Sequence, residues 1–329
     1  MSYSKEREVA VRAVEQASRL CQKVQANLVA DHALSKKDKS PVTVADFGAQ
    51  AVVTHVLSGS FPDVPLVGEE DAAELREAEN SPLTDQVVAN VREIVPDLDR
   101  DTVLDLIDRG TYAGGATGRH WTLDPIDGTK GFLRLEQYAV ALALIENGEV
   151  VLGVLGCPNL PIDASAPEGE RGCLFVAVKG EGAFVRLRGR DDEFRVSVTD
   201  VQDTARASFC ESVESAHSSQ DDSAKVAKRL GIVAPPYRID SQCKYAAVGR
   251  GDASIYLRLP TRKGYEEKIW DHAAGSMVIQ EAGGRVTDVR GKDLDFSLGR
   301  TLRDNLGVIV TNGHVHDRVV AAVREVLGE

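Results

Sequence analysis

The segment Asp124-Pro125-Ile126-Asp127-Gly128-Thr129, which follows the apolar stretch Trp121-Thr122-Leu123, decides how this chain is interpreted. Its proline fixes one backbone angle and its glycine permits angles closed to other residues, so the predicted turn is pre-set. Two carboxylates three residues apart, together with the carbonyl oxygen of Ile126, can then converge on one point. Hard oxygen donors of this kind suit magnesium, which keeps part of its water shell and shares ligands with phosphate.

Further acidic residues stand at the ends of apolar segments, where a sheet delivers its side chains to one rim: Glu69 and Glu70 after Leu66-Val67, Asp271 at the start of an expected helix, and Asp46 after Val44-Ala45. Together these acids carry enough charge for two cations about 3.5–4 Å apart, the spacing used for in-line phosphoryl displacement. Crowded carboxylates are costly to bury unless a cation neutralises them. Taken singly, the same residues also fit an ordinary turn, a helix N-cap and a solvated strand end.

The first part of the chain predicts helices followed by a run of strands. Hydrophobic periodicity indicates helices over 5–30, 44–58, 83–95 and 101–108, and the glycines between 110 and 118 indicate a loop. Asn147-Gly148, typical of a tight hairpin turn, lies between expected strands at 138–145 and 150–155. Further strands are expected at 173–178, 183–187 and 194–198. We therefore predict an N-terminal α+β domain over residues 1–200, with an antiparallel sheet and most of the metal ligands.

From about residue 205 the pattern alternates. Strands are expected at 205–210, 237–240, 253–259 and 306–310, and helices at 222–230, 242–250, 271–282 and 315–327. Such alternation is typical of an α/β layer. We therefore predict a C-terminal α/β domain over residues 201–329.

The amino-acid composition indicates which kinds of partner the protein can bind and in which compartment it is expected. The 329 residues include 39 Lys and Arg against 51 Asp and Glu, a net charge of −12, which argues against binding to a nucleic-acid polymer or an anionic membrane. The five cysteines are scattered without a CxxC pair, so reduced thiols are expected rather than disulfides or a zinc site. A charged N-terminus without a signal-like or membrane-spanning stretch predicts a cytoplasmic protein, with access to the nucleus left open.

Three motifs, in order along the chain, resemble the signatures of the lithium-sensitive magnesium phosphatases. They are Gly68-Glu69-Glu70, the 124–129 hexapeptide, and Trp270-Asp271-His272-Ala273-Ala274-Gly275. This superfamily contains inositol monophosphatases, fructose-1,6-bisphosphatases and bisphosphate nucleotidases. The resemblance implies a layered αβαβα sandwich and two or three Mg²⁺ ions per site. The implied ligands are the carboxylates of Glu69, Asp124, Asp127 and Asp271 and the carbonyl of Ile126.

Other segments resemble the 3′(2′),5′-bisphosphate nucleotidases, which remove the 3′-phosphate of adenosine 3′,5′-bisphosphate (PAP). The segments are 42–50, 129–134, 217–219, 240–245 and 256–260. A nucleoside bisphosphate has a second phosphate that the metals do not reach. A hydroxyl group and two cationic side chains would bind this phosphate, and an arginine can donate hydrogen bonds to two of its oxygens at once. The resemblance assigns this 5′-phosphate to Ser241, Lys244 and Arg258, places His217 beside the nucleoside, and adds Thr129 and Asp271 as substrate contacts.

The same resemblance implies that Asp46 and Thr129 orient a metal-activated water for in-line attack on the 3′-phosphorus. We therefore expect a magnesium-dependent phosphatase that converts PAP to AMP and phosphate, also accepts the sulfated analogue PAPS, and acts as a monomer. Two alternatives stay open: an inositol polyphosphate 1-phosphatase, which shares the metal motifs, and a protein that senses PAP without hydrolysing it.

Overall fold

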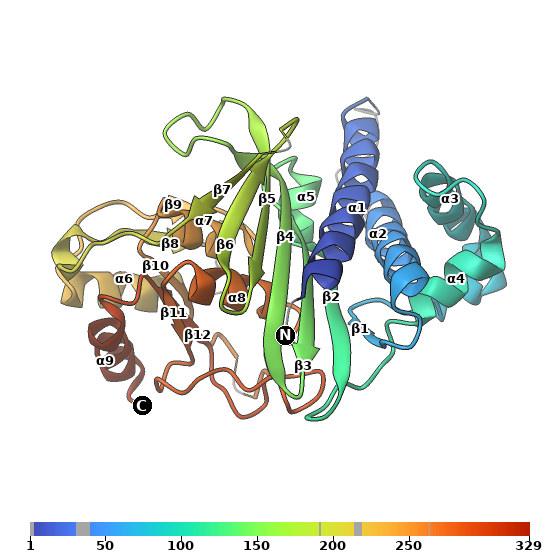
Figure 1. Cartoon of the computed structure of the whole chain (residues 1–329). Coiled ribbons are helices and arrows are strands. Elements are labelled where there is room, and N and C mark those ends of the chain that lie inside the picture. Colours follow the sequence, from blue (N-terminus) through green and yellow to red (C-terminus); the bar gives the residue numbers. More distant parts are fainter. Residues whose placement is uncertain (1–2, 31–39, 191, 214–218, 263) are drawn as a thin grey trace.

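The structure is a computed structural model that describes residues 3–30, 40–190, 192–213, 219–262 and 264–329. Helices α1 (Ser4–Ala30) and α2 (Ser40–Ser60) cover one face of a seven-stranded sheet (Figure 1). Helices α7 (Cys243–Arg250) and α8 (Ala273–Glu281) lie between that sheet and a five-stranded one. Helices α6 (Gln220–Arg229) and α9 (His316–Leu327) pack on the outer side. This succession confirms the predicted αβαβα sandwich.

The seven-stranded sheet has its strands in chain order: β1 (Leu66–Gly68), β2 (Arg119–Asp127), β3 (Ala139–Glu146), β4 (Glu149–Pro161), β5 (Arg171–Val178), β6 (Gly182–Leu187) and β7 (Glu193–Val196). β1 pairs with β2 in parallel and all later pairs are antiparallel. The hairpin between β3 and β4 turns at Asn147 and Gly148, whose φ angles of 52° and 81° suit the tight turn that the sequence predicted.

The five-stranded sheet is mixed and has the order β11-β12-β10-β8-β9. Its strands are β8 (Phe209–Glu211), β9 (Tyr237–Arg238), β10 (Ile255–Arg258), β11 (Arg285–Thr287) and β12 (Val308–Thr311). β10 pairs in parallel with β8 and antiparallel with β12. The alternation of strands and helices after residue 205 is therefore confirmed, although the observed strands are shorter than predicted.

Smaller elements fill the connections. α3 (Ser81–Arg92) and α4 (Arg100–Asp108) pack beside α2, and α5 (Thr129–Leu133) follows β2. Three short 3₁₀ turns lie at Glu74–Arg76, Ala78–Asn80 and Thr204–Arg206. The helix that the sequence predicted over 271–282 begins only at Ala273, so Asp271 lies before the helix rather than inside it.

Three apolar clusters fill the spaces between the layers. The first lies under α1 and α2, the second between the two sheets, and the third under α6 and α9. The second cluster joins residues from both sides of position 200, such as Ala141 of β3 and Tyr245 of α7. The helices between the sheets therefore share one core with each sheet. A division into domains at residue 200 stays a prediction.

The five cysteines are buried with free thiols, in agreement with the absence of a CxxC pair. Among the helices that the structure describes, none has the length and hydropathy needed to cross a membrane.

Candidate active site

A β-bulge in β2 brings Asp124 and Asp127 to the same face of the sheet. Side chains three residues apart on a regular strand point to opposite faces. Here Asp124 pairs with Ala141 of β3 and Asp127 pairs with Ala139, so β2 carries one residue more than β3 over this stretch. The extra residue realigns the two carboxylates, and Pro125 is tolerated because a bulge interrupts the ladder. The sequence predicted a turn at this motif, whereas the strand continues to Asp127.

Gly128 then starts α5 in a conformation that other residues rarely adopt. Its φ is 92°, and a Cβ added there would lie 2.8 Å from the Cβ of Ser241. A side chain at this position would therefore push away the segment that leads into α7. That segment matters because the backbone N–H of Gln242 donates to Oδ2 of Asp127 at 2.5 Å and so fixes one carboxylate of the motif.

The acids predicted from distant segments meet at this point. Burial, together with the charges of Glu70 and Asp127, raises the pKa of Glu69 to about 7, against the lowering effects of a hydrogen bond with Asp124 and of the charge of Lys268. Burial and the charges of Glu69, Asp127 and Asp271 raise the pKa of Asp124 well above its ordinary value. Such mutual effects act over a few ångströms. The acid directly after β1, the two on β2 and the one before α8 therefore lie near enough for their charges to act on one another.

Asp46 approaches the same site from α2. Burial raises the pKa of its carboxyl group, and the charges of Glu70 and Glu69 add to the effect. Thr129 is exposed at the start of α5. Within the described residues no hydrogen bond joins Asp46 to Thr129, so their role as a pair stays a prediction. His217 lies outside the described residues.

The donor set fits a divalent cation. Oδ1 of Asp124 is buried and has no hydrogen-bond partner among the described residues, although a buried carboxylate oxygen normally has one. Among the described residues, Asp46, Glu69 and Asp124 have no ion pair with an arginine or lysine, and burial raises their pKa values. A cation with a preference for oxygen ligands would satisfy that oxygen and favour the ionised form of every carboxylate at once.

A second acidic cluster beside the first was missed from the sequence. Ligand atoms of Glu267, Asp271 and His272 lie within 4.8 Å of one another, a spacing that could also hold a metal. However, Nε of Arg258 lies 2.7 Å from Oε2 of Glu267, and Nη2 lies 3.5 Å from Oδ2 of Asp271. The guanidinium group of Arg258 is therefore already paired with the carboxylates of this group.

A chain of hydrogen bonds completes this arginine-centred cluster. Oη of Tyr245 lies 2.7 Å from Nδ1 of His272, and Nε2 of His272 lies 3.2 Å from Oε2 of Glu267. Burial opposes ionisation of Glu267, but the hydrogen bond with His272 and the charge of Arg258 lower its pKa to about 2. Because an ionised carboxylate only accepts, His272 donates to Glu267 from Nε2. The sequence signal that could have identified Glu267 is its position four residues before Asp271.

Lys244 is a buried cation without an ion pair among the described residues. Its exposed fraction is 3%, and its Nζ lies 5.1 Å from the centre of the Tyr256 ring. Burial lowers its pKa, while the charge of Asp127 acts in the opposite direction. Ser241, at the start of the same segment, has a φ of 64°, which is unusual for a residue other than glycine. Both residues lie where the sequence predicted contacts to a second phosphate.

Three further side chains hold the backbone around the acids. Nε2 of Gln50, from α2, donates to the carbonyl oxygens of Glu70 and Ile107 at 2.6 and 2.8 Å. Nε2 of Gln242 donates to the carbonyl of Trp270 at 2.9 Å, next to Asp271. These contacts fix the segments that carry Glu69 and Asp271, and no motif pointed to them.

Arg300 is the third of these side chains. Its guanidinium donates to the carbonyl oxygens of Gly68, Gly110 and Tyr112 at 2.6, 3.0 and 3.0 Å. It also lies 4.9 Å from the centre of the Trp270 ring. One side chain thus joins the residue before Glu69, the start of the glycine-rich segment and the residue before Asp271. The loop predicted over 110–118 is therefore anchored at its beginning.

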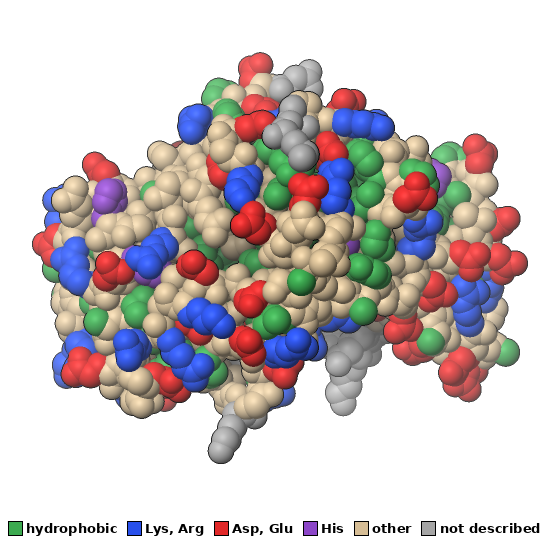
Figure 2. Space-filling model, turned by 60° about the horizontal axis from the view of Figure 1, so that its bottom comes forward, with side chains coloured by type: hydrophobic (Ala, Val, Ile, Leu, Met, Phe, Trp, Pro, Cys, Tyr) green, Lys and Arg blue, Asp and Glu red, His purple; other side chains and the backbone are tan. Residues whose placement is uncertain are grey.

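A hollow of about 160 Å³ opens beside Arg258. Its wall includes Pro260, Arg262 and the half-exposed ring of Tyr265. Elsewhere on the surface, Figure 2 shows acidic and basic side chains interspersed over the face that it presents. This mixture agrees with the net charge of −12.

Comparison with known proteins places the chain in a family. The profile of the family described as "Inositol monophosphatase family" matches residues 3–327. The 3′(2′),5′-bisphosphate nucleotidase of Emericella nidulans is 46% identical over 99% of this chain and 99% of its own length. The 3′(2′),5′-bisphosphate nucleotidase 1 of Arabidopsis thaliana is 48% identical over 100% of this chain and 98% of its own.

Solved structures with the same fold have more distant sequences. Inositol monophosphatase from Anabaena (Nostoc) superposes with a TM-score of 0.63 at 18% identity, covering 98% of this chain and 96% of that one. SuhB of Mycobacterium tuberculosis gives a TM-score of 0.62 at 20% identity, covering 99% and 98%. The chain therefore belongs to the inositol monophosphatase family, whose members are metal-dependent phosphatases.

Proposed function

We propose that this protein is a magnesium-dependent phosphatase that hydrolyses the 3′-phosphate of PAP to give AMP and phosphate, and that it also accepts PAPS. Relatives that are 46–48% identical over nearly the whole chain carry the name 3′(2′),5′-bisphosphate nucleotidase. The observation that carries the proposal is the buried ammonium group of Lys244, which lies close to the acids and has no ion pair among the described residues. A substrate with an anionic group beyond the scissile phosphate would pair it. Action as a cytoplasmic monomer remains the expectation from the sequence.

The side chains of Glu69, Asp124, Asp127 and Asp271 and the carbonyl of Ile126 would hold two or three Mg²⁺ ions. Magnesium in such a site neutralises phosphoryl charge and lowers the pKa of water. The ligands come from segments that Gln50, Gln242 and Arg300 fix, which supports a pre-organised site. The rigid bulge of β2 would keep the two aspartates aligned while the phosphate is transferred.

Asp46 and Thr129 would orient the attacking water. The hydroxyl of Thr129 would donate to the carboxylate of Asp46 and accept from the water, which directs the water's free electron pair at phosphorus. Burial and the charges of Glu70 and Glu69 raise the pKa of Asp46, so its carboxylate is a stronger base than an exposed one. Attack in line with the 3′-oxygen then needs no covalent intermediate with the protein.

The 5′-phosphate would lie against Ser241, Lys244 and Arg258, with Asp271 and Thr129 near the 3′-phosphate and His217 beside the nucleoside. The hollow beside Arg258 would receive the nucleoside, with the ring of Tyr265 as a surface on which a base can stack. Arg258 is partly neutralised by Glu267, whereas Lys244 is not, so Lys244 is expected to provide the stronger attraction.

The test is a phosphate-release assay with PAP, PAPS, inositol 1,4-bisphosphate and fructose 1,6-bisphosphate, each with Mg²⁺ and with a chelator. We expect PAP to be the best substrate and release to fall to background with the chelator. Release from inositol 1,4-bisphosphate at least tenfold faster than from PAP would instead identify an inositol polyphosphate phosphatase. Binding of PAP by calorimetry without phosphate release would identify a sensor.

A second assay tests the role of Lys244. We expect Lys244→Met to raise KM for PAP by about tenfold or more, because a charge-assisted hydrogen bond to phosphate contributes about 1.5–3 kcal/mol. Adenosine 3′-monophosphate, which lacks the 5′-phosphate, is the matched substrate and should be hydrolysed by the variant and the wild type alike. An equal loss with both substrates would contradict the assignment of Lys244 to the 5′-phosphate.

A further inference from the structure

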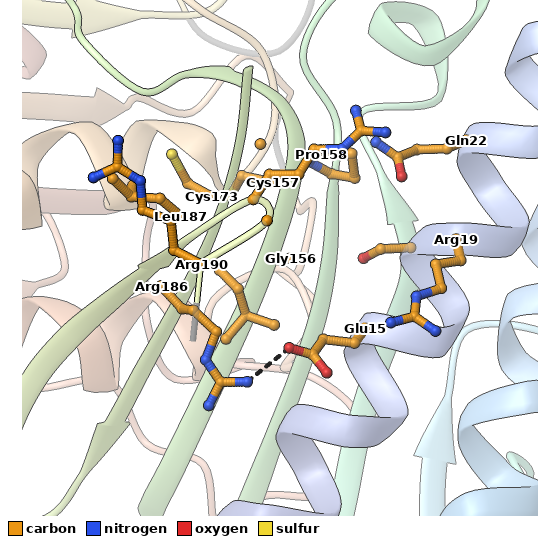
Figure 3. A pocket seen from close by; sticks show the side chains of 15 residues that line it. Glu15, Arg19, Gln22, Gly156, Cys157, Pro158, Cys173, Arg186, Leu187 and Arg190 are labelled. Atoms are coloured by element: carbon orange, nitrogen blue, oxygen red, sulfur yellow. Dashed lines mark hydrogen bonds and ion pairs between the residues drawn. The ribbon is translucent and has the colours of Figure 1, made fainter. Parts of the chain in front are cut away.

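A second hollow, of about 360 Å³, lies between α1 and the strands β4 to β6. Figure 3 shows Glu15, Arg19 and Gln22 on α1 facing Cys157, Pro158, Arg186, Leu187 and Arg190 across the opening. The volume falls in the range of about 300–1,000 Å³ that is usual for small-molecule sites. None of the residues assigned to the phosphatase site lines this hollow.

Two glycines on neighbouring strands line the hollow and allow close packing at its edges. A Cβ on Gly156 of β4 would lie 2.5 Å from Oγ of Ser18 and 2.7 Å from Cγ1 of Val14, so α1 can approach the strand only at a glycine. Gly172 of β5 has a φ of 119°, and a Cβ there would lie 2.8 Å from Cβ of Arg188.

The wall of this hollow is positively charged, although the protein as a whole is negatively charged. Four arginines line it against one glutamate, in a chain whose net charge is −12. Arg186 is held by Glu15 at 2.8 Å and by Glu193 at 2.9 Å. The other three, Arg19, Arg188 and Arg190, have no ion pair among the described residues. Like charges gathered without counter-charges repel one another, and an anion would relieve that repulsion.

We propose that this hollow is a second binding site, for a small molecule that carries phosphate or sulfate groups. Guanidinium groups bind such groups through paired, charge-assisted hydrogen bonds. Pro158, Leu174 and Leu187 add an apolar part to the wall, against which the rest of the molecule would lie. The site is separate from the phosphatase site, because its walls belong to α1, to β4–β6 and to the turn after β6, whereas the acids lie after β1, on β2 and before α8.

Charge reversal at two exposed arginines tests the proposal. Inorganic pyrophosphate and ADP are titrated by calorimetry, in the presence of a chelator, into wild-type protein and into the double variant Arg188→Glu/Arg190→Glu. The matched control is Arg206→Glu/Arg324→Glu, which changes the net charge equally at exposed arginines that do not line the hollow. Circular dichroism and the rate of phosphate release from PAP report whether either variant alters the fold or the phosphatase site.

We expect Arg188→Glu/Arg190→Glu to weaken binding of pyrophosphate about tenfold or more, and the control pair to change it less than twofold. Tighter binding of ADP than of pyrophosphate, lost in the same variant, would show that the apolar wall holds the organic part of the molecule. Equal binding would show that the phosphates alone are recognised. The proposal is overturned if both double variants bind the probes alike, or if wild-type protein binds neither probe at millimolar concentration.

Discussion

Two neighbouring groups of buried acids in this protein have pKa values shifted in opposite directions. Among the metal-site acids (Glu69, Asp124, Asp127 and Asp271), burial and mutual repulsion raise the pKa values of Glu69, Asp124 and Asp271, to about 7 at Glu69. In the arginine-centred cluster (Arg258, Glu267 and His272), the pKa of Glu267 falls to about 2. The difference lies in the cation. In the arginine-centred cluster a guanidinium nitrogen lies 2.7 Å from Glu267, whereas Glu69 and Asp124 have no ion pair among the described residues. The metal-site acids therefore need a cation from solution, and the arginine-centred cluster does not.

Asp271 lies between the two groups and shows the balance directly. Burial raises its pKa to about 7 against the lowering effects of Arg258 and His272, and Asp127 raises it further. Its carboxylate can therefore bind a metal on one side while Arg258 limits its repulsion on the other. Asp271 therefore interacts both with the metal-site acids and with the arginine-centred cluster.

The largest expected effect comes from Asp124→Asn. Removing this carboxylate should lower kcat for PAP by about a thousandfold or more, a change of about 4 kcal/mol in the activation free energy. The same variant should stabilise the metal-free protein at pH 8, because it removes a buried, repelled charge. Asp97→Asn, at an exposed residue, is the control and should change neither quantity. Activity of Asp124→Asn within tenfold of wild type would contradict the central place of Asp124.

A large loss of stability is expected from Glu267→Gln. The variant leaves Arg258 mostly buried without its closest carboxylate, and breaking a buried pair usually costs about 3–5 kcal/mol. Since the side chain of Arg258 is 20% exposed, we expect a decrease of about 2–3 kcal/mol in the free energy of unfolding, measured by urea denaturation. Glu266→Gln, at the exposed neighbour, should cost less than about 1 kcal/mol. Equal effects would show that the pair contributes little.

Arg300→Lys should lower kcat by about tenfold to a hundredfold with little change in KM, because small displacements of reacting groups have effects of this size. A lysine keeps the charge but cannot reach three carbonyl oxygens at once. Arg303→Lys, at an exposed residue, is the control. A change in KM without a change in kcat would indicate that Arg300 acts on substrate binding instead of on the alignment of Glu69 and Asp271.

The smallest effect is a dependence of stability on pH that metal should remove. A carboxyl group whose pKa is raised in the folded state stabilises the fold below its unfolded pKa of about 4, and this contribution is lost as the pH rises through about 7. Thermal unfolding in chelator should therefore show a midpoint that falls between pH 4 and pH 8. With Mg²⁺ the fall should largely disappear, and a fall of the same size in both conditions would contradict the comparison.

Glu267 should produce the opposite dependence. Because its pKa is lowered to about 2, its contribution is complete above its unfolded pKa of 4.5 and is lost as the pH falls through about 2. In Glu267→Gln this loss of stability at acid pH should be smaller than in the wild type, as measured by the same thermal unfolding below pH 4. If the variant and the wild type lost stability equally at acid pH, other carboxyl groups would be responsible for that loss.

Short-range patterns in the sequence predicted the helices and strands, and the resemblance to a known family implied their arrangement in layers. Periodicity identified the helices, and Asn147-Gly148 identified the hairpin. The bulge at Pro125 could not be predicted, since its existence depends on the register between β2 and β3. For this reason the motif at 124–129, which the sequence predicted as a turn, instead continues strand β2 as far as Asp127.

The residues that hold the site in place were harder to predict. Gln50 and Arg300 act through backbone carbonyls of segments far away along the chain, so neither belongs to a local pattern. Glu267 is separated from the arginine that it pairs with by a loop. Such contacts follow only from tertiary packing, whereas the carboxylates themselves were visible because their chemistry restricts the residue type.

The most direct test of the account is an anomalous difference map from crystals grown with Mn²⁺ in place of Mg²⁺. The account predicts peaks within about 2.5 Å of carboxylate oxygens of Glu69, Asp124 and Asp127. A map with its only peak at Glu267 and His272, or with none near Asp124, would contradict it.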